Sequence, residues 1–155
     1  MAELRLDVAA SSVSAARSFV RSHVVALGGD ESAQDRAALL VSELVTNAVL
    51  HARTQALVSV ELTAGDVLAF MIAVADGSAA RVRQRRYGPQ ESTGRGLRLV
   101  ESLSAEWGVE PSQAISAAGK SVWFRLLAHC EDIDDGREAD LALDLFDVEA
   151  YEDSV

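Results

Sequence analysis

Apolar side chains recur every three to four residues through the first third of the chain, a spacing that predicts two amphipathic helices. The first is expected over about 11–27, opening on a serine cap and stopped by the glycine pair at 28–29. The second is expected to begin after Asp30, whose side chain can cap its free N–H groups, and to end near Arg53.

Apolar runs and strict alternation elsewhere in the chain predict short strands. These strands are expected at residues 4–8, 56–63, 67–75, 107–109 and 121–127. The second and third form a hairpin around a turn at 64–66. Residues 76–93 have no period and form a loop, after which Gly94 opens a helix to about Glu106. This order predicts an α+β fold, a two-layer α/β sandwich in which one mixed or antiparallel sheet is covered by helices on one face.

The net charge of −10 comes entirely from the C-terminal end of the 155 residues. Residues 1–130 contain 13 acidic and 13 basic side chains, whereas 131–155 contain 11 acidic side chains and only Arg137. A neutral body gives no electrostatic case for nucleic-acid binding. We therefore expect one folded domain over 1–128 and an acidic tail over 129–155 that is mobile or weakly helical.

Two interpretations of the acidic tail stay open. It could fold back over the arginine-rich stretch 81–86 or over a partner-binding face and weaken nucleotide or partner binding, because a tethered opposite charge has a high effective concentration. It could equally be a solvated segment that makes no contact.

Cysteine usage and hydropathy indicate the compartment. A single cysteine, Cys130, excludes a disulfide framework, and no apolar segment has the length of a membrane span. The expectation is a cytoplasmic protein without membrane contact.

Three polar side chains, Glu43, Asn47 and His51, follow one another at intervals of four residues in the second predicted helix. In an α-helix this spacing stacks them in a row along one edge of the apolar face, as in the wall of a binding site. Taken alone, the row favours a solvated helix edge, because Glu and Asn are ordinary helix residues.

Two further stretches favour the binding site. Asp76 ends an apolar strand, where a carboxylate can accept a hydrogen bond from an exocyclic amine, although turns also favour aspartate. Gly94 and Gly96 lead into a helix, whose free N–H groups and positive dipole end can hold a phosphate. A flexible stop before a helix would have the same sequence.

In combination and in order, these motifs resemble the GHKL ATPase superfamily, whose domain is the Bergerat fold. The segments that resemble it are ELVTNAVLHA at 43–52, DGS at 76–78, GRGL at 94–97 and GKSVWF at 119–124. Within the superfamily, roughly residues 4–128 look like the anti-sigma-factor serine/threonine protein kinases.

This resemblance implies a site for ATP and Mg²⁺. Glu43 would be the general base that activates the attacking hydroxyl, Asn47 would coordinate Mg²⁺, and Asp76 would bind the adenine amine. Further nucleotide contacts are implied for Ser78, Gly94, Arg95, Gly96, Leu97 and Ser121. An amide oxygen is a ligand that suits Mg²⁺, and a carboxylate near the hydroxyl is what phosphoryl transfer needs.

The resemblance leaves two functions open. The first is a kinase that phosphorylates a Ser or Thr of an antagonist (anti-anti-sigma) protein and binds a sigma factor, with a homodimer as one assembly it allows. The second is a non-catalytic module that sequesters a regulatory partner, with or without nucleotide. Intact Glu43 and Asn47 favour the kinase, whereas Ser78 replaces a glycine of the wider superfamily and keeps the binding module open. The four arginines within 81–86 could contact phosphate, a partner or only water.

Overall fold

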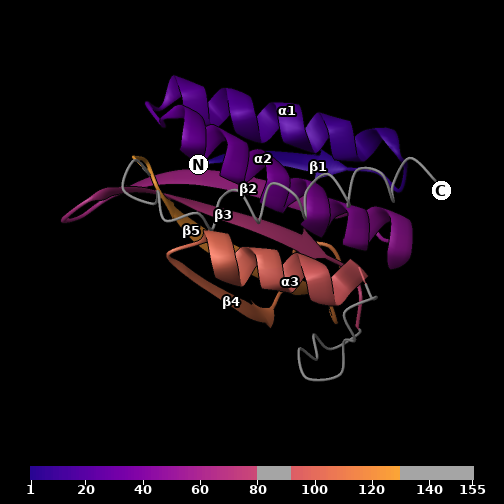
Figure 1. Ribbon diagram of the computed structural model, residues 1–155. Coiled ribbons are helices and arrows are strands. Elements are labelled where there is room, and N and C mark those ends of the chain that lie inside the picture. Colours follow the sequence, from indigo (N-terminus) through magenta and orange to yellow (C-terminus); the bar gives the residue numbers. More distant parts are fainter. Residues whose placement is uncertain (80–91, 130–155) are drawn as a thin grey trace.

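A five-stranded sheet covered on one face by three helices makes up the computed structural model, which describes residues 1–79 and 92–129 (Figure 1). The helices are α1 (Ser11–Ala26), α2 (Glu31–Val45) and α3 (Ser92–Leu103), and a short π-helix, η1 (Thr46–His51), continues α2. The strands are β1 (Ala2–Leu6), β2 (Ala56–Ala64), β3 (Leu68–Asp76), β4 (Glu106–Pro111) and β5 (Lys120–Leu127). The predicted α+β sandwich with helices on one face is confirmed.

The strands lie in the order β1-β2-β3-β5-β4, and each neighbouring pair is antiparallel. Of the two sheet types predicted, the antiparallel one is therefore found in the described residues, and the mixed one is not. The reason is the place of β5. β3 and β4 run in the same direction, as expected for strands joined through a helix, but β5 lies between them and is antiparallel to both.

The first strand ends at Leu6, two residues earlier than predicted. The Asp7 carbonyl accepts hydrogen bonds from the Ala9 N–H at 2.9 Å and from the Ser12 hydroxyl at 2.7 Å. Because the turn uses this carbonyl, pairing with β2 stops before it. Ser12 therefore ties α1 to the preceding turn, and the predicted serine cap is wrong, since no side chain caps the start of α1.

The boundary between α1 and α2 follows the sequence prediction. Gly28 adopts a φ of +92°, a conformation that glycine reaches without strain, and the Gly29 N–H bonds the Val24 carbonyl at 2.8 Å. Asp30 then caps α2, because its Oδ1 accepts a hydrogen bond from the Ala33 N–H at 2.8 Å.

The third helix is shifted from its predicted place. It begins at Ser92 instead of Gly94 and ends at Leu103 instead of near Glu106. Its end is set by the sheet, because the Ala105 N–H bonds the Arg125 carbonyl at 2.8 Å and β4 starts at the next residue.

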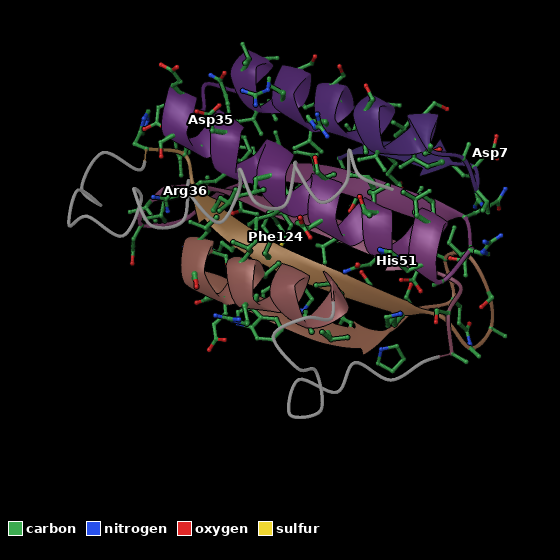
Figure 2. All side chains as sticks on the ribbon, turned by 45° about the vertical axis from the view of Figure 1, so that its right-hand side comes forward. Asp7, Asp35, Arg36, His51 and Phe124 are labelled. Atoms are coloured by element: carbon green, nitrogen blue, oxygen red, sulfur yellow. The ribbon has the colours of Figure 1, made fainter. Side chains whose placement is uncertain are left out.

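The core lies between the sheet and the helix layer. Its largest fully buried side chains are Phe70 of β3 and Phe124 of β5, and Phe124 lies between the sheet and the helices (Figure 2). Because side chains alternate along a strand, every second residue of each strand lies on this face. Site residues described below lie at the ends of β3 and β5.

Some predictions concern residues outside the described ranges 1–79 and 92–129. These are the predictions for the arginines within 81–86 and for the acidic tail beyond residue 129, which stay predictions. Within the described ranges, no helix is both long and apolar enough to cross a membrane.

Candidate functional site

Asp76 is the last residue of the central strand β3, and its carboxylate is held in place. Oδ1 accepts a hydrogen bond from the Ser78 N–H at 2.8 Å and another from Lys120 Nζ at 3.1 Å. Asp76 shares a face with Ile72 and Val74, which is the face that the helices cover. At 7% exposure, it is an acceptor at the edge of the core.

The backbone after Asp76 is held from both sides. The Gly77 N–H donates to Thr54 Oγ1 at 3.1 Å, and the Gly77 carbonyl accepts from the Ser116 hydroxyl at 3.0 Å. Thr54 follows η1, whereas Ser116 lies between β4 and β5. Gly119 packs so closely on the Asp76 carbonyl that a Cβ there would overlap it. Two segments far apart in sequence, the one after η1 and the connection between β4 and β5, therefore fix the end of β3.

The helix above this strand end changes its winding. The Ala52 N–H bonds the Asn47 carbonyl, five residues back, at 2.8 Å. Just upstream, the Ser42 and Thr46 hydroxyls each donate to the carbonyl four residues earlier, at 2.7 and 2.6 Å. Such bonds compete for helix carbonyls and bend helices. The predicted helix to Arg53 is therefore α-helical only to the end of α2, and Arg53 leaves η1 with a φ of +58°.

This change in winding breaks the predicted row of three polar side chains. Glu43 is 3% exposed and Asn47 is partly buried, whereas His51 is exposed. The hydrogen bond from residue 52 runs back five residues to residue 47, so the α-helical spacing behind the predicted row does not continue past position 47. Figure 2 shows His51 at the end of η1. The row is therefore reduced to Glu43 and Asn47.

Among the described residues, a single buried side-chain oxygen or nitrogen lacks a hydrogen-bond partner, and this atom is Oδ1 of Asn47. Leaving such a group unpaired costs about 1–3 kcal/mol, so native proteins seldom do so without a reason. An amide oxygen is also a hard donor of the kind that Mg²⁺ binds. The atom therefore fits a metal ligand.

The start of α3 lies at the same end of the molecule as Asp76 and η1. Arg36, early in α2, donates from Nη1 to the carbonyl of Leu103, the last residue of α3, at 3.4 Å. Figure 1 shows the two helices running in opposite directions, so the start of α3 lies toward the same end of the helix layer as η1. Figure 2 shows Arg36 and His51 at opposite ends of the α2–η1 helix.

The GRGL motif lies inside the first two turns of α3, which begins two residues before the predicted start at Gly94. The first four N–H groups of a helix have no partner within it, and those of Gly94 and Arg95 are among them. Gly96 follows one residue later. The side chain of Leu97 is 4% exposed and belongs to the hydrophobic core.

Lys120, which the sequence reasoning did not single out, is the β5 residue paired with Asp76. Ser121 pairs with Ala75, and alternation along β5 turns its side chain to the opposite face of the sheet. The alternation of side chains along β5 could have identified Lys120 from the sequence. Positions 122, 124 and 126 are apolar core positions, so position 120 falls on their face.

Comparison with known families bears on this arrangement. Residues 6–126 match the histidine kinase-like ATPase domain family. The chain belongs to this family. The match covers nearly the whole described part of the chain, and the resemblance to the GHKL superfamily seen in the sequence is confirmed.

Among solved structures, this ATPase domain is similar to the RsbU and RsbW domains of Rv1364c from Mycobacterium tuberculosis, with a TM-score of 0.55 and 21% sequence identity. The similarity covers 82% of this chain and 33% of that chain, so this chain spans about a third of its length. At this identity the likeness supports the fold. No curated protein matches the sequence.

Proposed function

We propose that this ATPase domain binds ATP with Mg²⁺, phosphorylates a serine or threonine of an antagonist protein and also binds a sigma factor. The family match supports nucleotide binding, and the sequence resemblance to anti-sigma-factor kinases supports binding of the two protein partners. One observation carries the chemistry, namely the buried Asn47 Oδ1 without a partner among the described residues.

Asp76 and the start of α3 would hold the two ends of the nucleotide. The Asp76 carboxylate would accept a hydrogen bond from the adenine amine, and its fixed position removes the cost of ordering it on binding. The free N–H groups at the start of α3, including those of Gly94 and Arg95, would donate to phosphate oxygens. Ser78, Gly96 and Leu97 remain further predicted contacts, and Ser121 does too, although its side chain lies on the sheet face opposite that of Asp76.

Asn47 would be the protein ligand of Mg²⁺. The bound ion would neutralise charge on the phosphate oxygens. Asn47 Oδ1 would gain through it the partner that it lacks among the described residues. Asn47 also lies one residue after the point where η1 begins, so the wider π turn sets where this oxygen stands.

Glu43 would act as the general base. Its carboxylate would take the proton of the attacking Ser or Thr hydroxyl while that oxygen bonds the γ-phosphorus and the bond to the β–γ bridging oxygen breaks, releasing ADP. Glu43 lies four residues before Asn47 on the same helix and is buried. Base and metal ligand would therefore act from neighbouring positions.

The test separates binding from transfer. Calorimetry of ATP and ADP with and without Mg²⁺ measures binding, and mass spectrometry of candidate antagonist proteins measures transfer. Glu43→Ala should bind ATP as wild type does and lose transfer by about 10²- to 10⁴-fold. Asn47→Ala should lose the Mg²⁺-dependent part of ATP binding. Glu61→Ala, which changes an exposed glutamate on β2, is the control and should behave as wild type.

Two results would count against this function. Equal transfer by Glu43→Ala and wild type would exclude Glu43 as the base. Tight ATP binding by wild type, with no transfer to any antagonist protein tested, would favour the non-catalytic binding module instead.

A further inference from the structure

The side-chain pairs that join β3 to β5 on the helix-covered face end in a charged pair. Toward the candidate site, these pairs are Phe70–Leu126, Ile72–Phe124, Val74–Val122 and Asp76–Lys120. The first three are core residues, each at most 5% exposed. In the last pair, Lys120 Nζ lies 3.1 Å from Asp76 Oδ1. The charges therefore lie where the core reaches the proposed nucleotide site.

Burial distinguishes this ion pair from a surface pair such as Arg21–Asp35. The Lys120 and Asp76 side chains are 19% and 10% exposed, against 43% and 62% for the surface pair. A buried ion pair rarely stabilises a fold more than apolar residues of similar volume do. An apolar pair here would simply continue the row, so fold stability does not explain the charges.

The Asp76–Lys120 pair has hydrogen-bonding capacity left over. Asp76 Oδ1 accepts from the Ser78 N–H and from Lys120, whereas Oδ2 accepts from no residue that the structure describes. The Lys120 ammonium has three N–H groups, and in the described residues it makes one hydrogen bond, to Asp76. A free acceptor and free donors therefore stand side by side at the end of the sheet.

We propose that Lys120 donates a hydrogen bond to the ring nitrogen beside the exocyclic amine of adenine, while Asp76 accepts one from that amine. The inference rests on the proposed ATP binding and adds a specificity residue to it. Adenine has an amine donor next to a ring-nitrogen acceptor, N1 on one edge and N7 on the other. Guanine has the acceptor O6 in place of the amine, which would face the Asp76 carboxylate.

The second contact narrows which bases the site accepts. A carboxylate alone accepts a hydrogen bond from any suitably placed amine. With Lys120 beside it, the base must present an acceptor next to that amine, because otherwise the ammonium loses water without gaining a partner. Lys120 can donate to the base and stay bound to Asp76, since one N–H serves each.

The test uses ATP analogues in which one ring nitrogen is replaced by C–H. Calorimetry with Mg²⁺ measures the affinity of the full chain for ATP, 1-deaza-ATP and 7-deaza-ATP. Wild type should bind one analogue about 10- to 100-fold more weakly than ATP, as expected for a lost hydrogen bond to a charged group. The other analogue should bind as ATP does, which identifies the nitrogen. Lys120→Met should bind ATP and the sensitive analogue equally, and Lys120→Arg should restore the difference.

Arg125→Met is the matched control. Arg125 lies on the same strand and pairs with Glu106 at 3.9 Å, but alternation places it on the opposite face of the sheet. This variant should discriminate between the analogues as wild type does.

Three outcomes would overturn the inference. If Lys120→Met weakens ATP and both analogues by one factor, Lys120 has a structural role only. If wild type binds ATP but does not distinguish the analogues, Lys120 does not contact a ring nitrogen of adenine, while the proposed function stands. If wild type binds no ATP, the proposed function and the inference fail together.

Discussion

Replacing Gly119 by alanine should destabilise the fold and disturb the nucleotide site together. A Cβ at this position would overlap the Asp76 carbonyl oxygen and lie 3.0 Å from the Ser112 carbonyl oxygen. Both obstacles are backbone atoms, which cannot move aside by a change of rotamer. The backbone at the end of β3 or the loop before β5 must therefore shift.

Overpacking of this kind typically costs 1–3 kcal/mol. Because backbone lies against the new methyl group from two sides, we expect a loss of about 2 kcal/mol in the free energy of unfolding. For a domain of this size that corresponds to a fall of roughly 4–8 °C in Tm. Moving Asp76 should also weaken ATP binding by about tenfold or more, the loss expected for one hydrogen bond to a charged group.

Gly65→Ala is the control for Gly119→Ala. Gly65 lies between β2 and β3, and a Cβ there would meet no atom within 4 Å. Neither glycine has a positive φ, so the two substitutions differ in the contact and not in backbone strain. Urea unfolding should shift its midpoint in Gly119→Ala at an unchanged slope and leave the Gly65→Ala midpoint within about 0.5 kcal/mol of wild type. Equal unfolding free energies for the two variants would refute the close approach of Gly119 to β3.

Three further substitutions test single features. Asp76→Asn should weaken ATP binding about 10- to 100-fold in a competition titration, since it removes a charged acceptor; wild-type affinity would exclude Asp76 as the base contact. Asp30→Ala should lower the unfolding free energy by about 1 kcal/mol in urea through loss of the α2 cap, and an unchanged midpoint would contradict that cap. Phe124→Ala should lower the unfolding free energy by about 3–5 kcal/mol, because the ring is fully buried; calorimetric unfolding measures it, and a loss below 1 kcal/mol would contradict its place in the core.

Local chemistry made several elements predictable from the sequence. The Asp30 cap and the stop at Gly28 depend only on residues within one helical turn, so short-range patterns identify them. The β2–β3 hairpin follows from a tight turn between two apolar runs. The order of the four motifs indicated the ATPase family, and the acidic tail is visible in composition alone.

The winding of the helix above the site was not predictable in this way. Ser42, Thr46 and Asn47 are compatible with an α-helix, and periodicity assigned one through to Arg53. In the structure, η1 ends at His51, and three residues later the Thr54 hydroxyl oxygen accepts a hydrogen bond from the Gly77 N–H, so a tertiary contact with the end of β3 follows the wider turn. Within that wider turn Asn47 Oδ1 is buried, whereas His51 at its end is exposed.

Strand order and register were likewise settled only in three dimensions. Nothing local places β5 between β3 and β4, because that order depends on how α3 returns the chain across the sheet. Once β5 lies there, its register sets Lys120 opposite Asp76 and turns Ser121 to the other face. A shift of one residue would exchange the two, since side chains alternate with a period of two. The sequence by itself therefore determined the family and the acidic end of the β3 strand, and tertiary pairing decided which side chain meets that acid.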